Sequence, residues 1–201
     1  LIGKKGSPEV TLIDPLLDRV DAYLKLLEEE RLTLVGVIDT HTHADHLSGS
    51  ASLRDRTNCA YIMHRYTDVA DVSTRLGEGT LVIADVPLQI VYTPGHTKDS
   101  ISIVVDKYLL TGDVLFLDEG GAGRLDLPGG DAGEHWDSMQ RLLGLPEFLE
   151  VHPAHDYRNR IPSTMALQRK NNLYLQHPTK DEHLIFVKNL RHGPSDWMTE
   201  V

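Results

Sequence analysis

Apolar residues recur along the first forty positions with a spacing that changes from strand-like to helical and back. Residues 1–15 predict a hairpin whose turn is KKGSPE, residues 4–9. Leucine, valine and tyrosine then recur every three or four residues and predict an amphipathic helix over 15–30, with Asp14 as its N-cap. The stretch LTLVGVID, residues 32–39, predicts a buried strand. This order favours a parallel pair of strands, and sites in such sheets lie beyond the carboxyl ends of the strands.

The later apolar stretches are shorter and predict a mixed fold. Strands are expected over residues 59–64, 80–84, 88–93, 100–106, 108–116 and 147–157. Helices are expected over residues 134–144, 163–175 and 181–190. Residues 120–133 are rich in glycine, and an irregular loop of that length is more often functional than idle. We therefore predict a single domain of the α/β class over residues 1–201, with antiparallel pairs as well as βα units.

Composition narrows the possible partners. The formal net charge is −10, which gives a nucleic-acid role no electrostatic support, and the longest apolar runs are too short to span a membrane. A single cysteine excludes a disulfide framework. The chain starts at Leu1 without a methionine, so we expect a few N-terminal residues to be missing. A cytoplasmic location is expected if the source is bacterial, and a mitochondrial one fits a eukaryotic source with a removed transit segment.

Residues 38–49, IDTHTHADHLSG, hold the densest group of metal-binding residue types in the chain. His41, His43, Asp45 and His46 fall within six positions, just past the predicted strand. Imidazole and carboxylate groups bind borderline divalent metals well. The plain alternative, a polar segment before a helix, accounts poorly for three histidines and an aspartate so close together. The segment therefore predicts a metal site.

Three more candidate ligands follow later apolar segments. His96 stands in YTPGHTKDS, Asp113 in LLTGDVLF and His155 in VHPAHDY. Each is weak alone, because a lone histidine at a strand end is more often structural. Together with the four residues of the first cluster they give seven potential ligands.

The order H-x-H-x-D-H, then His, Asp and His, resembles the metallo-β-lactamase superfamily over residues 1–163. That resemblance implies an αββα sandwich with its metal site at one edge of the two sheets. The segments DTHTHADHLSG, TPGHT, LLTGDVLF, GRLD and HPAHDY are similar to those of persulfide dioxygenases. The chain after His155 is too short for the C-terminal helical domain of glyoxalase II, the competing branch.

The dioxygenase resemblance implies one Fe(II) per chain, held by His41, His96 and Asp113, a facial set that leaves positions open. It also implies oxidation of glutathione persulfide by O₂ to sulfite and free thiol. The other four candidates are then outer-shell groups: His43, Asp45, His46 and His155. Two alternatives remain open. One is a dinuclear zinc hydrolase of the glyoxalase II type that acts on a thioester, with all seven residues as zinc ligands. The other is a non-catalytic metal-containing binding module. Zinc is also compatible with the purified protein.

Arg124 in GRLD and Tyr157 after His155 resemble the family's substrate-site arginine and tyrosine, with Asp126 and Asp156 as supporting groups. A solvated loop arginine and an interior tyrosine remain the alternatives. The family often has glycine where Arg158 stands, so a persulfide of coenzyme A or bacillithiol is a further possibility. A homodimer is compatible with the family. We expect Cys59 to be a buried structural thiol and His64 to be structural or peripheral, and no pattern supports a role for the histidines at 135, 152, 177, 183 and 192.

Overall fold

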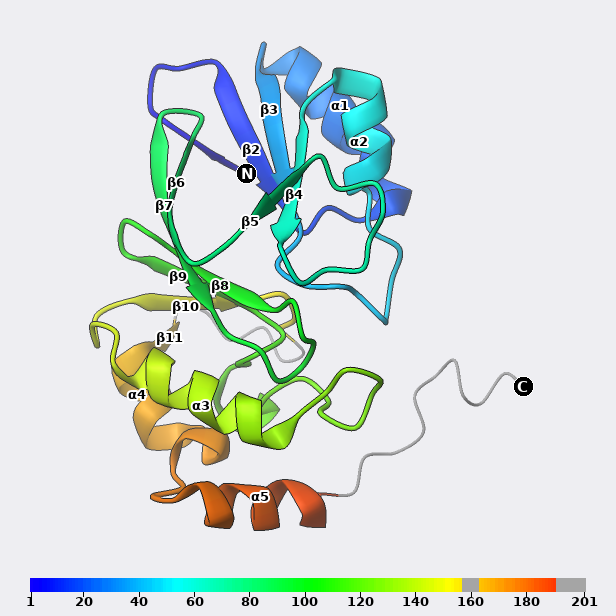
Figure 1. Ribbon diagram of the computed structural model, residues 1–201. Helices are drawn as coiled ribbons and strands as arrows, with labels where there is room; N and C mark the ends of the chain where they lie inside the picture. Colours follow the sequence, from blue (N-terminus) through cyan, green and yellow to red (C-terminus); the bar gives the residue numbers. More distant parts are fainter. Residues whose placement is uncertain (157–162, 191–201) are drawn as a thin grey trace.

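Two β-sheets stack face to face, and helices cover the outer face of each sheet (Figure 1). The computed structural model describes residues 1–156 and 163–190. The order of layers is helix, sheet, sheet, helix, which confirms the αββα sandwich that the sequence resemblance implies. Among the described residues, no helix combines the length and the apolar character needed to cross a bilayer.

The first sheet contains five strands in the order β1-β2-β3-β4-β5. Their bounds are Ile2–Gly3, Glu9–Ile13, Thr33–Ile38, Ala60–His64 and Thr74–Leu76. β1 and β2 form the expected antiparallel hairpin, and the other pairs are parallel. The helices α1 (Val20–Glu29) and α2 (Ser50–Thr57) cover its outer face. Leu27 of α1 and Leu53 of α2 are buried in one cluster with Val10 and Val37 of the sheet.

The second sheet contains six strands in the order β11-β10-β9-β8-β7-β6. In chain order, β6 to β11 span Gly79–Ile83, Val86–Tyr92, Ile101–Val105, Tyr108–Gly112, Glu150–Pro153 and Ser163–Thr164. Only β9 and β10 pair in parallel, connected through α3. The helices on this side are α3 (Ala132–Leu143), α4 (Met165–Asn171) and α5 (Lys180–Asn189). Met139 and Leu142 of α3 are buried in one cluster with Leu109 and Val151 of the sheet.

Isoleucines dominate the core between the two sheets. Ile38 and Ile62 from the first sheet are buried in one cluster with Ile90, Ile101 and Ile103 from the second. Burying each such side chain stabilises the fold by about 1.5–3 kcal/mol. This central core fixes the carboxyl ends of β3 and β4 against the loops of the second sheet.

Asp14 does not cap the first helix, so that prediction was wrong. The residue has a φ of 48°, and the helical segment begins instead with a 3-10 turn at Leu17–Arg19. The Asp14 carboxylate accepts hydrogen bonds from the backbone N–H of Thr40 at 2.7 Å and from the Thr40 hydroxyl at 2.9 Å. The segment that follows the adjacent parallel strand β3 thus supplies the donors, in place of the N–H groups of a helix N-terminus.

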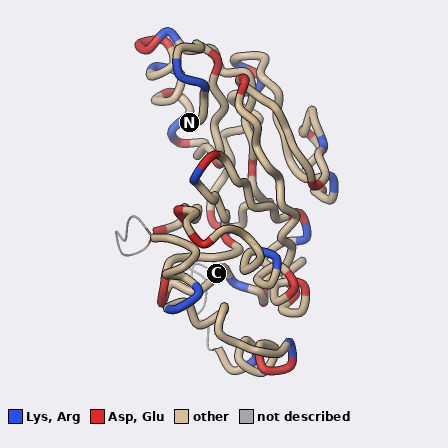
Figure 2. The backbone as a smooth tube through the Cα atoms, turned by 90° about the vertical axis from the view of Figure 1, so that its left-hand side faces the viewer, with Lys and Arg blue, Asp and Glu red and all other residues tan. Residues whose placement is uncertain are grey.

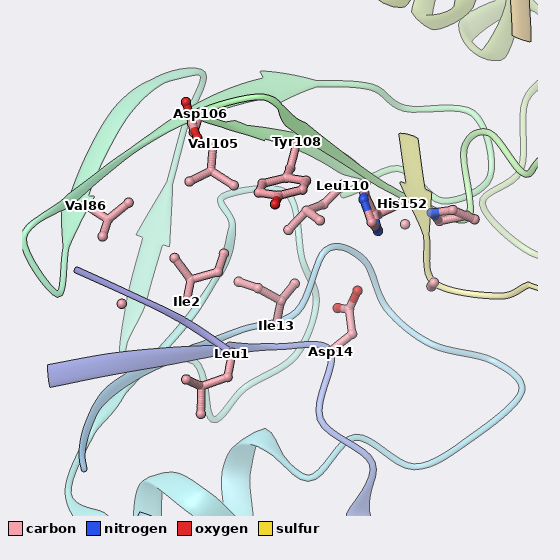
Figure 3. Close-up of a pocket in the computed structure, with 14 residues that line it drawn as sticks. Leu1, Ile2, Ile13, Asp14, Val86, Val105, Asp106, Tyr108, Leu110 and His152 are labelled. Carbon is pink, nitrogen blue, oxygen red and sulfur yellow. The ribbon is translucent and has the colours of Figure 1, made fainter. Parts of the chain in front are cut away.

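Two predicted strands are shorter than expected. The strand predicted over 108–116 ends at Gly112, where a φ of 51° turns the chain, and the one over 147–157 forms only at Glu150–Pro153. A hollow of about 660 Å³ lies between the sheets beside β1. In Figure 3, Ile13 from the first sheet faces Tyr108 and Leu110 from the second across this hollow, with Asp14 at one end.

Candidate metal centre

Three donor side chains converge from the ends of three strands. His41 follows β3, His96 follows β7 and Asp113 follows β9. The Nε2 atoms of His41 and His96 lie 3.9 and 3.8 Å from Oδ2 of Asp113, and the three donor atoms lie within 4.8 Å of one another. Ligands bound about 2.1 Å from one ion lie roughly 3–4 Å apart. The strand-end pattern in the sequence therefore predicted this convergence.

Hydrogen bonds fix the tautomer of His41. Its Nδ1 lies 2.9 Å from Oγ1 of Thr40, and that hydroxyl donates its proton to Oδ2 of Asp14, also at 2.9 Å. The Thr40 oxygen must then accept from Nδ1–H of His41. Nε2 of His41 is left with its lone pair directed toward Asp113.

His96 is oriented in the same way by a backbone carbonyl. Its Nδ1 lies 2.8 Å from the carbonyl oxygen of Arg124, which can only accept, so Nδ1–H donates. Nε2, the other ring nitrogen, faces Asp113 at 3.8 Å. Outer-shell contacts of this kind orient the imidazole ligands of protein metal sites.

The three residues fit a divalent metal ion. His41, His96 and Asp113 are only 1%, 5% and 7% exposed. Nε2 of His41 and Oδ1 of Asp113 are buried without a hydrogen-bond partner among the described residues, a costly state for polar atoms that a bound cation would relieve. Burial lowers the pKa of His41 to about 3, so its ring is neutral at physiological pH. Burial also raises the pKa of Asp113, and a nearby cation would oppose that effect.

Two glycines let the ligand loops approach each other closely. Gly112 has a φ of 51°, and a Cβ there would lie 2.6 Å from Oγ1 of Thr40. A Cβ at Gly123 would lie 2.5 Å from the carbonyl oxygen of Asp113 and 2.7 Å from Nδ1 of His96. Side chains at either position would push the ligands apart.

Two buried aspartates hold the loop after β3 in place. Asp39 accepts hydrogen bonds from the hydroxyls of Ser48 and Ser50 at 2.7 Å and of Tyr61 at 2.8 Å. Asp99 accepts from the hydroxyls of Thr42 at 2.7 Å and Thr97 at 2.6 Å. These hydrogen bonds lower the pKa of Asp99 although its burial acts in the opposite direction.

A second, more open group lies beside the first. Donor atoms of His43, Asp45 and His46 also lie within 4.8 Å of one another. Asp45 contacts Nε2 of His155 at 3.0 Å and Nδ1 of His46 at 3.1 Å, and Nε2 of His155 lies 3.6 Å from Oδ1 of Asp113. All seven predicted ligands are therefore in one place.

Paired charges set the protonation of this second group. The hydrogen bond from His155 lowers the pKa of Asp45, and the same contact raises the pKa of His155. Burial lowers the pKa of His43, but its contact with Asp14, 3.3 Å from Nε2, outweighs that effect and raises it to about 9. Asp45 thus forms an ion pair within the group, whereas His43 is paired with Asp14 outside it.

A model of the metallo-β-lactamase superfamily matches residues 2–155. The chain belongs to this superfamily. Mouse persulfide dioxygenase ETHE1, mitochondrial, is 32% identical over 177 residues, which cover 86% of this chain and 68% of the mouse protein. A beta-lactamase hydrolase-like protein from Xylella fastidiosa (strain Temecula1) is 28% identical over 210 residues. The match covers 87% of this chain, which spans about half of the Xylella protein.

Solved structures of the superfamily agree with this membership. The crystal structure of ETHE1 from Myxococcus xanthus superposes with a TM-score of 0.90 at 33% identity, and covers 100% of this chain and 88% of that one. The structure of TTHA1623 in a di-iron-bound form has a TM-score of 0.67 at 27% identity, and covers 81% of this chain and 88% of that one. Both structures superpose over most of this chain, in agreement with its αββα architecture.

Among the predicted substrate residues, the structure pairs Arg124 with Asp126. Nε and Nη2 of Arg124 donate to the two carboxylate oxygens at 2.9 and 2.7 Å. Asp156 is exposed, and Tyr157 and Arg158 lie outside the described residues. The pairing forms a bidentate bridge within the glycine-rich loop.

Four residues without a predicted metal role are buried in the fold: Cys59, His64, His135 and His183. Cys59 is buried, as expected, and His64 stacks on the ring of Tyr92 with their centroids 4.3 Å apart. His135 and His183 are fully buried, and Nδ1 of His135 lies 3.3 Å from Nε2 of His183. No sequence pattern indicated a supporting role for four residues, namely Asp14, Asp39, Thr40 and Asp99, although the first two directly follow buried parallel strands.

Proposed function

We propose that the chain is a persulfide dioxygenase that holds one Fe(II) on His41, His96 and Asp113. The substrate is glutathione persulfide, which reacts with O₂ and water to give glutathione, sulfite and two protons. The observation that supports this function best is the deeply buried set of two imidazoles and one carboxylate. Fe(II) bound to such a set supplies redox chemistry with O₂ and has open positions for a second reactant. The similarity to the mouse and Myxococcus ETHE1 proteins supports the same function.

The neighbouring residues keep the ligand set in one geometry and manage protons. Thr40 and Asp14 hold His41, and the carbonyl of Arg124 holds His96. Nε2 of His155 lies between Oδ2 of Asp45, at 3.0 Å, and Oδ1 of Asp113, at 3.6 Å. In this function His155 carries a proton at Nε2 and directs it toward the carboxylates of Asp45 and Asp113. Asp45 is then paired with His155 and does not bind metal.

A dinuclear zinc hydrolase acting on a thioester is the second candidate function. The close approach of donor atoms from His43, Asp45 and His46 favours it, as does the similarity to a protein solved in a di-iron-bound form. We prefer one metal because the second group is more open. The Asp45 side chain is 47% exposed and already contacts His46 and His155.

The test loads the purified protein with Fe(II) or Zn(II) without oxygen and measures metal content and turnover. The proposed function requires about one iron per chain and iron-dependent oxygen uptake that yields sulfite from glutathione persulfide. Two zinc ions per chain with thioester hydrolysis would establish the hydrolase instead. Glutathione binding without turnover of either substrate would indicate a binding module.

Replacing Asp113 by alanine should abolish metal retention, because it removes the carboxylate that faces both imidazoles. Metal content after gel filtration gives the measurement. Asp181→Ala, an exposed position on α5, is the matched control and should retain metal. Full metal occupancy in the Asp113 variant would remove this residue from the ligand set.

A further inference from the structure

A groove of about 380 Å³ opens beside the metal ligand His96. Four loops line it: those after β3, β4 and β7, and the glycine-rich loop before α3. Its lining includes Tyr66, Asp68, His96, Lys98, Asp99 and Leu127. A small molecule whose reacting sulfur is at the metal therefore has room for the rest of its structure in this groove.

One wall of the groove is a fixed aromatic surface. The ring of Tyr66 is 50% exposed and packs edge-on against the rings of His64 and Tyr92, with centroids 5.0 and 5.6 Å away. The hydroxyl of Tyr92 in turn donates to the carbonyl oxygen of Lys98 at 2.8 Å. These contacts tie the aromatic wall to the loop that carries His96, so the distance from the wall to the metal ligand is set by the fold.

Two exposed side chains of opposite charge line the groove. Lys98 is the one lysine or arginine among the described residues that line it, and Asp68 is exposed as well. Asp99 also lines the groove, but it is 3% exposed and its carboxylate is bonded to Thr42 and Thr97. A ligand therefore meets one ammonium and one carboxylate, beside apolar surface from Tyr66 and Leu127.

We propose that this groove binds the amino-acid part of a small zwitterionic thiol, with Lys98 pairing with a carboxylate and Asp68 with an ammonium group. The inference rests on the proposed function, because it assigns the groove residues that recognise the carrier of the persulfide sulfur. The protein has a net charge of −10, and basic positions are dispersed among acidic ones along the chain (Figure 2). A carrier with several phosphates, such as coenzyme A, would find one cation here, whereas glutathione matches both charges.

The test measures binding separately from turnover. Iron-loaded protein is titrated with reduced glutathione by calorimetry without oxygen, and oxygen uptake with glutathione persulfide is measured in parallel. Lys98→Met should weaken glutathione binding about two- to fivefold, the effect of one exposed ion pair, and raise KM with little change in kcat. Lys188→Met, an exposed position on α5, is the control and should bind as the wild type does.

The dimethyl ester of glutathione identifies the group that Lys98 contacts. It should bind the wild type more weakly than glutathione does, and the Lys98→Met variant should show a smaller difference between the two compounds. Asp68→Asn should weaken glutathione but not its N-acetyl derivative. Three results would overturn the proposal. The wild type could bind the ester as tightly as glutathione, the Lys98 and Lys188 variants could lose the same glutathione affinity, or the protein could bind coenzyme A more tightly than glutathione.

The two proposals fail separately. Lys98-dependent glutathione binding without oxygen uptake would retain the groove and reject the dioxygenase. If the protein consumes oxygen and neither Lys98→Met nor Asp68→Asn changes KM, the dioxygenase function stands and the proposed role of the groove is wrong.

Discussion

Replacing Gly123 by alanine should weaken metal binding while the fold persists. The new Cβ would lie 2.5 Å from the carbonyl oxygen of Asp113 and 2.7 Å from Nδ1 of His96. Non-bonded heavy atoms pack best at about 3.5–4 Å, so the Asp113 backbone or the His96 ring must move by roughly 1 Å. Metal sites keep their ligand distances within about 0.2 Å, so a displacement of this size is large for the site.

The expected loss of metal affinity can be estimated in two ways that agree. Overpacking of a close contact costs about 1–3 kcal/mol, and loss of outer-shell support costs about 10- to 100-fold in metal affinity. We expect zinc or iron affinity to fall by about 10- to 100-fold, measured by competition with a chromophoric chelator. The far-ultraviolet circular dichroism spectrum should remain that of the wild type.

Gly129→Ala provides a control in the same loop. Gly129 has a φ of 89°, and a Cβ there would meet no atom within 4 Å among the described residues. This variant should lose about 1–2 kcal/mol of stability from backbone strain and keep its metal affinity. Wild-type affinity in the Gly123 variant, or equal loss in both variants, would refute the steric reasoning.

Substrate use and acid stability depend on other residues. Arg124→Ala should raise KM for glutathione persulfide several-fold with little change in kcat. Unchanged steady-state kinetics would show that the Arg124–Asp126 bridge stabilises the loop and does not contribute to substrate binding. Burial lowers the pKa of His135 to about 3 from 6.5, so the unfolded chain binds more protons between these values and stability falls as pH drops below 6.5. Urea unfolding of the metal-saturated protein at pH 7.0, 5.5 and 4.5 should show this fall. His135→Gln should reduce the slope by up to about 1.4 kcal/mol per pH unit, and an unchanged slope would contradict the assignment.

The sequence predicts the convergence of the three candidate ligands well because they follow a simple rule of sheet geometry. A strand of the sandwich ends shortly before each of His41, His96 and Asp113, and the carboxyl ends of these strands meet at one edge. The apolar pattern therefore locates the donors before any contact is known. The same rule applies to Asp14, which directly follows β2, where Ile13 pairs with Ile38. The sequence around Asp14 also fits a helix N-cap, and for that reason this position was missed.

Elements without a strong apolar pattern were missed. In α2 only Ser50 and Leu53 are buried, so its sequence SASLRDRT shows no helical stripe, and β5 is only three residues long. Supporting contacts were missed for a different reason. The hydrogen bonds from Thr42 to Asp99 and from His96 to the carbonyl of Arg124 join residues far apart in the chain. A single sequence contains no information on such pairs.

The glycine-rich loop serves the metal centre chiefly through its backbone. The N–H of Gly123 donates to the carbonyl of Asp113 at 2.8 Å, the carbonyl of Arg124 accepts from His96, and the N–H of Asp131 donates to the carbonyl of Gly95 at 2.8 Å. None of these three contacts depends on a side chain of the loop, yet together they join the loops that carry two ligands. The spacing of GRLD from Asp113 is thus explained by positioning of His96, independently of any contact between the Arg124 side chain and substrate. It follows that the GRLD resemblance supports the metal geometry more directly than it supports glutathione as the carrier, and that the carrier is better decided at Lys98 and Asp68.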